Sequence, residues 1–196
     1  MGGPGICGHG PPIWPAFSPQ NFFNALADAV EWIARHRGIL EVDHYLDDFI
    51  IIGPPQSKGC ANNLEVLLET CWQLGVPIAV HKCQGPTTCL EFLGIEIDTI
   101  AMELRLPQDK LTRLRTLIGE WCLRKACQKK DLQRLVGHLC HACKVVRPGR
   151  RFLRGMFSLL SGSRRSHHYI RLNRQFRADL EWWNVFLGME HRCCLR

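Results

Sequence analysis

Two adjacent aspartates, Asp47 and Asp48, lie within an apolar stretch that ends at Gly53. Successive side chains of a β-strand point to opposite faces, so a regular strand cannot present both carboxylates on one side. A tight turn between two short strands can present them together. Two unpaired negative charges held this close are costly to bury, and a divalent cation offsets their repulsion. The stretch therefore predicts a hairpin with the acid pair at its tip and Mg²⁺ as the ion, because Mg²⁺ favours carboxylate oxygens together with substrate phosphates.

A second interpretation of the acid pair is an ordinary surface turn, since aspartate is common in turns. The flanking residues favour a functional hairpin over that interpretation. Val42, Tyr45 and Leu46 precede the pair, and the run Phe49–Ile52 follows it. An Asp-Asp turn inside so apolar a stretch is unusual, and the two apolar strands would fix the position of the acids.

The chain has 196 residues, of which 46% are hydrophobic and 22% charged, which is enough for one core or at most two small subdomains. Its net charge of +7 at pH 7 favours a polyanionic partner, either nucleic acid or a membrane surface. No apolar run is long enough to span a bilayer, and the first residues lack the basic start and apolar core of a secretory signal. We therefore expect an intracellular protein without a membrane segment.

Eleven cysteines are scattered mostly along segments with helical patterns, and this odd number favours reduced intracellular thiols over a disulfide framework. Four possible zinc ligands lie close together in sequence: His138, Cys140, His141 and Cys143. They fall within one helical pattern, where residues one or two positions apart point in different directions. Buried thiols beside exposed histidines are therefore the favoured interpretation, with a zinc site as the alternative.

The pattern from residue 18 to residue 106 predicts helices with an antiparallel sheet. The first 17 residues are rich in glycine and proline and are expected to be irregular. The expected elements are, in order, a helix from Ser18 or Asn21 to near Gly38, the hairpin, a helix over 60–74, a short strand over 76–80, a strand over 90–97 and, after a turn at Asp98–Thr99, a strand through Met102, Leu104 and Leu106. The face that the first helix should bury consists of Phe22, Leu26, Ala29, Val30 and Ile33.

After Pro107 the pattern changes, and only helices are expected. Four apolar stripes at helical spacing carry this prediction: 111–121, 132–143, 152–160 and 176–187, the last capped by Asn173. The predicted fold class is therefore α+β, with an irregular segment at 1–17, a sheet-containing domain at 18–106 and an all-helical domain at 107–196. Residues 147–149 and 161–163 are further candidate breaks.

The residues Tyr45-Leu46-Asp47-Asp48 resemble the YxDD motif of reverse transcriptases, and other segments are similar to further parts of that family in the same order. These segments are Ser18-Pro19 with 22–26 (support of template and nucleotide), 74–77 with Lys82 (the lysine segment), Phe92-Leu93-Gly94-Ile95 (the primer-grip hairpin), and the helices after Pro107 (thumb and connection). Several such pieces in order are more specific than any one of them. The sequences at 85–88, 144–150 and 182–183 look most like retroelements of the DIRS type, in which a ribonuclease H region and a tyrosine recombinase follow the polymerase.

The resemblance implies a partial polymerase palm followed by a thumb, an RNA/DNA primer–template as partner, and phosphoryl transfer assisted by two Mg²⁺ ions. Asp47 would be the principal metal ligand, and Asp48 a weaker or second ligand. The primer and nucleotide contacts implied in the same way are Tyr45, Phe92, Leu93 and Gly94.

Two interpretations stay open for the basic residues. Lys82 would act as a general acid or charge stabiliser at the leaving pyrophosphate, or it would be an ordinary solvated lysine. A second basic group would contact the nucleic-acid backbone, or it would form a solvated helical face. This group consists of Arg147, Arg150, Arg151 and Arg154.

The sequence also departs from the family, which places a further metal-binding aspartate before the Ser18 segment. Residues 1–17 contain no Asp or Glu, and 14–17 replace a Gly-Leu-Arg-Ser type of run. We therefore expect a fragment of a retroelement RNA-directed DNA polymerase in the cytoplasm or nucleus, inactive alone and with weak or no Mg²⁺ binding. One alternative is a non-catalytic nucleic-acid-binding remnant of a transposable element. Another is a structural or interaction domain that uses Trp182 and Trp183 as contacts, which burial of these tryptophans would oppose.

Overall fold

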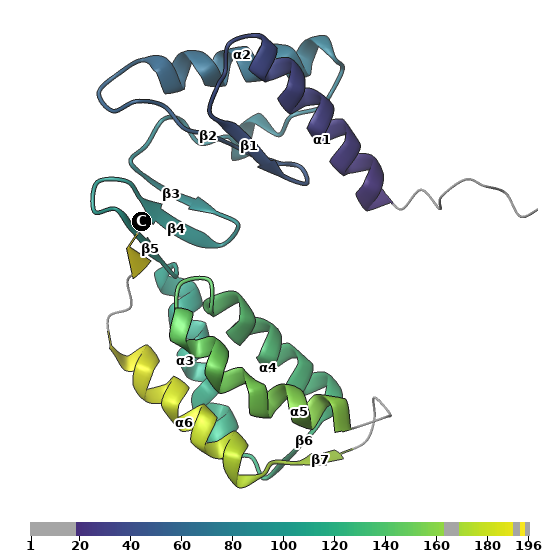
Figure 1. The fold of residues 1–196 in the computed structure, drawn as a ribbon, viewed down its shortest axis with the longest axis vertical. Helices are drawn as coiled ribbons and strands as arrows, with labels where there is room; N and C mark the ends of the chain where they lie inside the picture. The colour runs from purple at the N-terminus through teal and green to yellow at the C-terminus, as the bar shows by residue number, and fades with distance from the viewer. Residues whose placement is uncertain (1–18, 163–168, 190–192, 195–196) are drawn as a thin grey trace, which may run out of the picture. The chain divides into compact units, whose positions relative to one another are not determined.

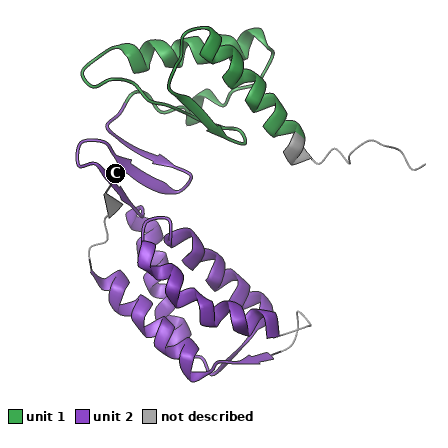
Figure 2. Cartoon of the chain, viewed as in Figure 1, with its two compact units in different colours: residues 1–86 green, residues 87–196 purple. Residues whose placement is uncertain are grey.

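The computed structural model describes residues 19–162, 169–189 and 193–194. The chain divides into two compact units, residues 1–86 (unit 1) and 87–196 (unit 2), as Figure 2 shows. The described part of unit 1 combines helices with a single hairpin (Figure 1). Its elements are α1 (Pro19–His36), β1 (Val42–Tyr45), β2 (Asp48–Ile51), α2 (Gly59–Gln73) and the 3₁₀ helix η1 (Val80–Lys82).

The hairpin predicted from the acid pair is present and organises unit 1. Its strands are antiparallel, with Val42 opposite Ile51 and Tyr45 opposite Asp48. A two-stranded hairpin is only marginally stable by itself, so it needs other elements to cover it. Here α1 packs against β1 and against α2, and α2 packs against β2. The buried cluster that results consists of Val30, Ala34, Ile39, Val42, Leu67 and Cys71.

The helix predicted after Ser18 is present as α1, and the face expected to be buried is confirmed in part, since Val30 is buried and Leu26 and Ile33 are half-buried. Phe22 and Ala29 are exposed, whereas Ala27, Val30 and Ala34 are buried. These three buried residues recur at helical spacing on one side of α1. The small side chains at 27 and 34 allow the helix to lie close to its neighbours, and a search for large apolar residues overlooks them.

The short strand predicted over 76–80 is wrong. Gly75, at φ +69°, ends α2, and the amides of Gly75 and Val76 donate to the carbonyls of Trp72 and Cys71. Pro77 then follows, and proline cannot donate a hydrogen bond to a sheet. The segment continues irregularly until η1 begins at Val80.

Unit 2 contains a larger antiparallel sheet and most of the helices (Figure 1). Its elements are β3 (Cys89–Phe92), β4 (Ile95–Asp98), β5 (Glu103–Arg105), α3 (Gln108–Cys122), β6 (Ala126–Gln128), α4 (Lys129–Ala142), the 3₁₀ helix η2 (Arg147–Leu153), α5 (Arg154–Gly162), β7 (Tyr169–Arg171), α6 (Arg174–Gly188) and β8 (Cys193–Cys194). The sheet has the order β3-β4-β5-β8, and every neighbouring pair is antiparallel. The turn predicted at Asp98–Thr99 joins β4 to β5, with Asp98 opposite Glu103.

The single strand predicted over 90–97 is wrong, because the chain turns back in its middle. Phe92 pairs with Ile95, and the two residues between them form the turn. Leu93 has φ +49° and Gly94 φ +75°. Positive φ at both central residues is the signature of a type I′ hairpin turn, whose twist matches that of the strands. Because Leu93 is apolar, the hydrophobic pattern continues through the turn, and periodicity alone predicts one uninterrupted strand.

The four helical stripes predicted after Pro107 are confirmed, and they meet in one buried cluster. Helices α3, α4 and α6 each contribute several fully buried side chains, including Ile118, Leu135 and Trp183. The predicted cap of the last helix is also present, since Asn173 Oδ1 accepts a hydrogen bond from the Phe176 amide at 2.8 Å. The third stripe is divided between η2 and α5.

The prediction that only helices follow Pro107 is wrong. β6 pairs with β7, with Cys127 opposite Ile170. Both residues are buried in the cluster that the helices form. Strands of three residues are too short to give a period, so the sequence pattern could not separate them from loops. The α+β fold class is as predicted, and the change from sheet to helices at Pro107 falls inside unit 2.

Candidate functional site

The turn of the β1–β2 hairpin consists of Leu46 and Asp47, because Tyr45 and Asp48 form the last pair of the ladder. Asp47 therefore lies at the tip, and Asp48 is the first residue of β2. Leu46 has φ +58°, a left-handed conformation that costs a non-glycine residue about 1–2 kcal/mol. Tyr45, Asp47 and Asp48 are all exposed. The arrangement presents two neighbouring carboxylates to solvent from a fixed backbone.

Side chains from α1 hold the hairpin in place. The Arg35 guanidinium donates to the carbonyl oxygens of Leu40, at 2.8 Å, and Val42, at 2.6 Å. It also pairs with Glu31, four residues earlier on the helix, at 2.8 Å. The backbone that enters β1 is thus attached to the helix by hydrogen bonds from a charged group, which are stronger than neutral ones.

The second predicted site segment, Phe92-Leu93-Gly94, forms the end of β3 and the turn into β4 in unit 2. His141 Nε2 lies 3.0 Å from the Leu93 carbonyl oxygen, and Lys110 Nζ lies 2.6 Å from Glu91 Oε1. A Cβ on Gly94 would approach Lys110 Nζ to 2.5 Å, and the φ of +75° adds strain for any other residue. The positive φ favours glycine at this position, and Lys110 would have to shift to admit a larger residue.

A groove of about 610 Å³ lies beside this turn, within unit 2. Its floor includes Leu106, Leu114 and Leu117, and Arg113 and His138 also line it. Because the groove joins the β3–β4 turn to α3 and α4, a molecule bound there would contact both the sheet and the helices.

Comparison with known structures identifies similar folds, among them three structures of a foamy viral protease-reverse transcriptase. The structure of the foamy viral protease-reverse transcriptase dRH in complex with double-stranded DNA matches at a TM-score of 0.61 and 19% identity, over 84% of this chain and 27% of that one. The foamy viral protease-reverse transcriptase in complex with an RNA/DNA hybrid matches at a TM-score of 0.56 and 17% identity, over 83% of this chain and 20% of that one. The foamy viral protease-reverse transcriptase in complex with double-stranded DNA matches at a TM-score of 0.55 and 17% identity, over 86% of this chain and 32% of that one.

This chain has a reverse-transcriptase-like fold. It spans about a fifth to a third of the length of these viral chains. At 17–19% identity the likeness shows the fold alone. The sequence matches no model of a known protein family and no curated protein.

Asp47 and Asp48, the predicted metal ligands, are both exposed on the β1–β2 hairpin. Exposed carboxylates suit Mg²⁺, which proteins bind through one or two carboxylates together with phosphates and water. Among the residues that the structure describes, no third histidine, cysteine or acidic side chain joins this pair in a group of possible ligands. Their assignment as metal ligands therefore stays a prediction.

The described structure does not bring Lys82 into an ion pair. Lys82 lies in η1, in the same unit as the aspartates, and its side chain is exposed. It makes no ion pair with an acidic side chain in the described ranges. Both of its interpretations, a charge stabiliser and a solvated lysine, therefore stay predictions.

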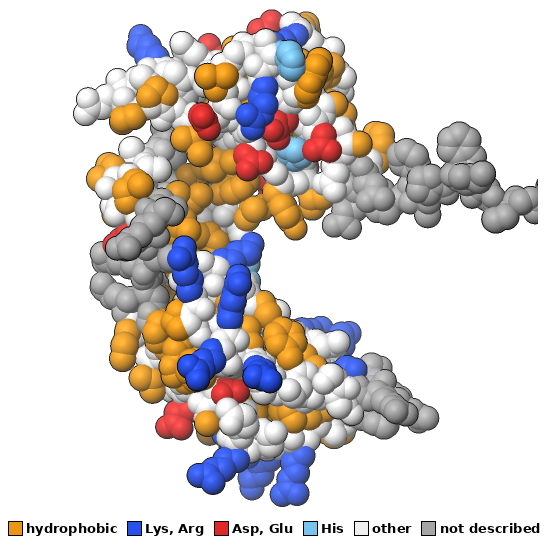
Figure 3. Space-filling view, viewed as in Figure 1, with side chains coloured by type: hydrophobic (Ala, Val, Ile, Leu, Met, Phe, Trp, Pro, Cys, Tyr) orange, Lys and Arg blue, Asp and Glu red, His pale blue; other side chains and the backbone are white. Residues whose placement is uncertain are grey.

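The four arginines predicted to contact nucleic acid lie on η2 and at the start of α5, and all four are exposed. They are Arg147, Arg150, Arg151 and Arg154. Gly149 seats η2 on α6, since a Cβ there would lie 2.4 Å from the Trp183 ring. Figure 3 shows Lys and Arg side chains gathered over unit 2, whereas acidic side chains and histidine gather on unit 1. None of the described helices is long and apolar enough to cross a membrane.

The tryptophans at 182 and 183 belong to the interior rather than to a contact surface. Trp183 is fully buried. Trp182 is half-buried and stacks between Phe152, at 3.9 Å between ring centroids, and Phe186, at 4.5 Å. This arrangement opposes the interaction domain in which these rings contact a partner.

The four possible zinc ligands, in α4 and just after it, differ in their burial. Burial raises the pKa of the Cys143 thiol to about 11 and also raises that of Cys140. Within the described ranges, these four residues do not come together as a group of possible metal ligands. His138 is exposed, and His141 contacts Leu93 instead.

Sequence reasoning missed the residues that position the two hairpins. These residues are Glu31, Arg35, His44, Lys110 and His141. The spacing of Glu31 and Arg35, four residues apart on a helix, is a signal for an ion pair. No signal in the sequence connects His141 to Leu93, which lies 48 residues earlier.

Proposed function

We propose that this chain is the palm-hairpin and thumb portion of a retroelement RNA-directed DNA polymerase, of the DIRS type, and that it binds an RNA/DNA primer–template. The observation that carries the proposal is the β1–β2 hairpin, which presents Asp47 at its tip within a reverse-transcriptase-like fold. Residues 18–106 would correspond to the palm and 107–196 to the thumb and connection. A ribonuclease H region would be linked to such a polymerase, in the cytoplasm or the nucleus.

Asp47 and Asp48 would hold Mg²⁺ together with the phosphates of the substrate. The ion would supply activation of the primer 3′-hydroxyl and stabilisation of charge on the phosphates. Tyr45, exposed at the end of β1, would pack beside the primer end. Leu93 and Gly94 would contact the primer from the β3–β4 turn, and Lys82 would stabilise the leaving group.

We expect no polymerisation by this chain alone, because the described residues bring only two carboxylates to the hairpin tip. Two ions in a phosphoryl-transfer site need more ligands than two adjacent acids provide. The test is extension of a labelled DNA primer on an RNA template with Mg²⁺ and nucleotides. Strong incorporation that Asp47→Asn abolishes would refute the expected inactivity and support the assignment of Asp47.

A second candidate function is nucleic-acid binding without catalysis, and the exposed arginines of η2 and α5 favour it. Phosphate contacts make affinity fall with salt, by a factor that reflects the number of phosphates neutralised. Affinity for a primer–template duplex should therefore be measured against salt concentration. A variant with Arg147, Arg150, Arg151 and Arg154 changed to Gln should reduce the salt slope by up to about 3.6, at about 0.9 for each contact with a duplex.

A control variant removes three positive charges from elsewhere in unit 2, against four in the test variant. Arg171, Arg174 and Arg177 lie in β7 and α6 of the same unit and are exposed. Changing these three to Gln should leave most of the slope intact. A salt response that is flat, or that falls equally in both variants, would contradict binding through the η2 arginines.

A further inference from the structure

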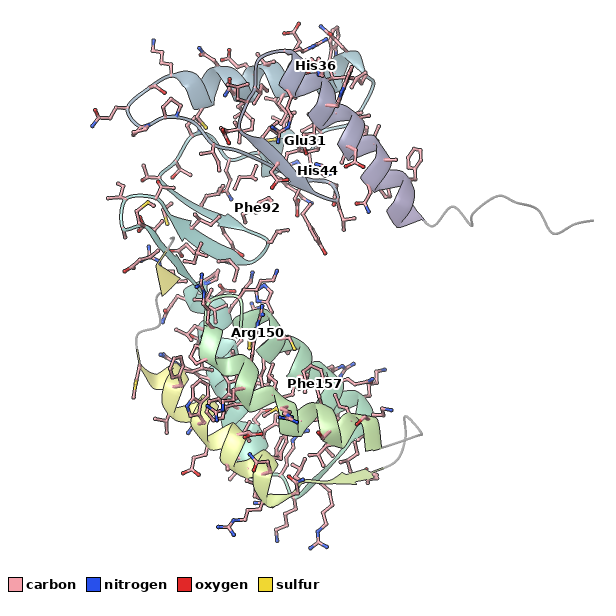
Figure 4. All side chains as sticks on the ribbon, in the orientation of Figure 1. Glu31, His36, His44, Phe92, Arg150 and Phe157 are labelled. Atoms are coloured by element: carbon pink, nitrogen blue, oxygen red, sulfur yellow. The ribbon has the colours of Figure 1, made fainter. Side chains whose placement is uncertain are left out.

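Glu31 on α1 and the neighbouring strand residues Asp43 and His44 bring possible metal-ligand atoms together in unit 1. One ligand atom from each residue lies within 4.8 Å of the other two. Figure 4 shows Glu31 and His44 facing each other from α1 and β1. This is the one group of at least three such residues found within the described ranges, and it does not include Asp47 or Asp48. It mixes a histidine with two carboxylates, a common donor set for divalent transition metals.

The imidazole of His44 lies between two carboxylates, one at each ring nitrogen. Its Nδ1 lies 2.6 Å from Glu31 Oε2, on the side of the group. Its Nε2 faces the other way, 3.3 Å from Oδ1 of Asp28, a residue outside the group. A histidine that binds a metal through one ring nitrogen usually directs the other at a carboxylate, which fixes the ring and makes the ligand more basic.

The two carboxylates also have outer partners. Arg35 binds Glu31 through Oε1, at 2.8 Å, and leaves Oε2 on the side of His44. Asp43 Oδ1 accepts a hydrogen bond from the His44 amide at 2.8 Å. Partial burial raises the pKa of Glu31, but hydrogen bonds from Arg35 and His44 outweigh it and leave the pKa below its ordinary value. Glu31 is therefore a carboxylate at neutral pH.

Charge and access also suit a cation. Asp28, Glu31 and Asp43 supply three negative charges, and Arg35 offsets one of them. The side chain of His44 is 11% exposed and that of Glu31 20%, while Asp43 is exposed. An ion would thus have protein ligands on one side and open positions for water on the other.

The geometry points to a binding site for a divalent transition-metal ion, of the Mn²⁺ or Zn²⁺ class, formed by Glu31, Asp43 and His44 and separate from the aspartates of the hairpin tip. A carboxylate only accepts hydrogen bonds, so the 2.6 Å contact needs a proton on His44 Nδ1. The ion replaces that proton, which is released to solvent. The two atoms then separate, since each must lie about 2.0–2.2 Å from the ion.

An ion in this position joins α1 to β1 just before Tyr45. It strengthens the attachment that Arg35 already makes, and it acts on the strand that leads to the hairpin tip. The site does not depend on the proposed polymerase function, because none of its ligands belongs to the Tyr45–Asp48 turn.

The test is a titration of the ¹⁵N-labelled full chain with substoichiometric Mn²⁺, followed by NMR. Mn²⁺ is the probe because thiolates prefer softer ions, so the cysteines compete little. Paramagnetic broadening should centre on residues 28–44, with a second centre at 47–48 if the tip also binds. Broadening that is absent from 28–44 would overturn the inference, whether or not the tip responds.

Variants then assign the ligands. His44→Gln and Asp43→Asn should each weaken Mn²⁺ binding at this site at least tenfold, as judged by the concentration that broadens the α1 resonances. His36→Gln is the control, since His36 lies on the same helix against Trp32 and outside the group. Asp47→Asn should leave the site unchanged. Equal affinity in His44→Gln and wild type would overturn the inference, and if that variant does not fold, the wild-type broadening map decides.

Discussion

Unit 2 buries nineteen described residues in one apolar cluster, whereas the corresponding cluster of unit 1 has six. Both units also have charged hydrogen bonds. In unit 1, Arg35 binds two carbonyl oxygens at the entry to β1, and Arg37 binds Thr70 and Gln73 of α2. In unit 2, Arg105 pairs with Asp98 and Lys110 with Glu91. The two units therefore differ mainly in the size of the buried apolar cluster, and truncation of buried side chains should affect unit 2 most.

The largest expected effect is that of Trp183→Ala. Trp183 is fully buried where α6 meets η2, and removing so large a core side chain costs about 3–5 kcal/mol. Urea unfolding monitored by circular dichroism measures the loss. Trp72→Ala is the matched control, because Trp72 is 80% exposed on unit 1 and its loss should cost less than about 0.5 kcal/mol. Similar losses from the two changes would contradict the comparison.

The next effect is that of Gly149→Ala, which adds a methyl group instead of removing one. The new Cβ would lie 2.4 Å from the Trp183 ring, and overpacking of this kind costs about 1–3 kcal/mol. Gly137→Ala in α4 is the control, since a Cβ there meets open space. It should stabilise the helix by about 0.5–1 kcal/mol. Thermal unfolding of both variants should show a lower stability for Gly149→Ala and a higher stability for Gly137→Ala. An unchanged stability of Gly149→Ala would refute the close packing of η2 against Trp183.

A smaller effect is expected from Asn173→Ala at the start of α6. The side chain satisfies the Phe176 amide, and loss of such a cap costs about 1 kcal/mol. Asn173→Asp should retain most of the stability, because aspartate is an equally good cap. Urea midpoints of the two variants provide the measurement, and an Asp variant as weak as the Ala variant would exclude capping as the cause.

The smallest effects are expected from pH, and Glu31 in unit 1 and Asp179 in unit 2 should respond in opposite directions. The pKa of Glu31 is lowered in the fold, so its contribution to stability is present above its unfolded pKa and is lost as the pH falls through the folded pKa. Burial raises the pKa of Asp179, although a hydrogen bond from Gln175 opposes the shift. Its ionisation therefore destabilises unit 2 as the pH rises above the unfolded value.

Glu31→Gln should flatten the acid dependence of unit 1, and Asp179→Asn should flatten that of unit 2 in the other direction. Urea unfolding at several pH values from 3 to 7, followed by NMR signals assigned to each unit, measures the stability of unit 1 and that of unit 2 separately. An unchanged acid dependence in Glu31→Gln would show that other groups carry the charge contribution of unit 1.

The same comparison explains how much the sequence could predict. The long apolar stripes of α3, α4 and α6 predicted both the helices and the buried residues, because burial of one face imposes a period on the sequence. The β1–β2 hairpin was predicted from adjacent charges in an apolar stretch. Three-residue strands such as β6 and β7 impose no period. Periodicity also predicted one strand through Leu93, and only the family resemblance indicated the hairpin there.

The sequence also could not predict the site residues that make polar contacts with residues distant in the chain. His44 meets Glu31 across 13 residues, and Lys110 meets Glu91 across 19. One hydrogen bond between distant residues leaves no repeated pattern, whereas a buried face repeats its signal at every turn of the helix. The placement of Asp47 at the tip and Asp48 in the strand depended on a register that only the structure provides.

The hydrogen bond between His141 and the Leu93 carbonyl has a mechanical consequence for unit 2. Together with the Lys110–Glu91 pair, it clamps the loop of the β3–β4 hairpin to two helices at once. Because these two contacts join one hairpin to both α3 and α4, a displacement of either helix should move the β3–β4 turn with it.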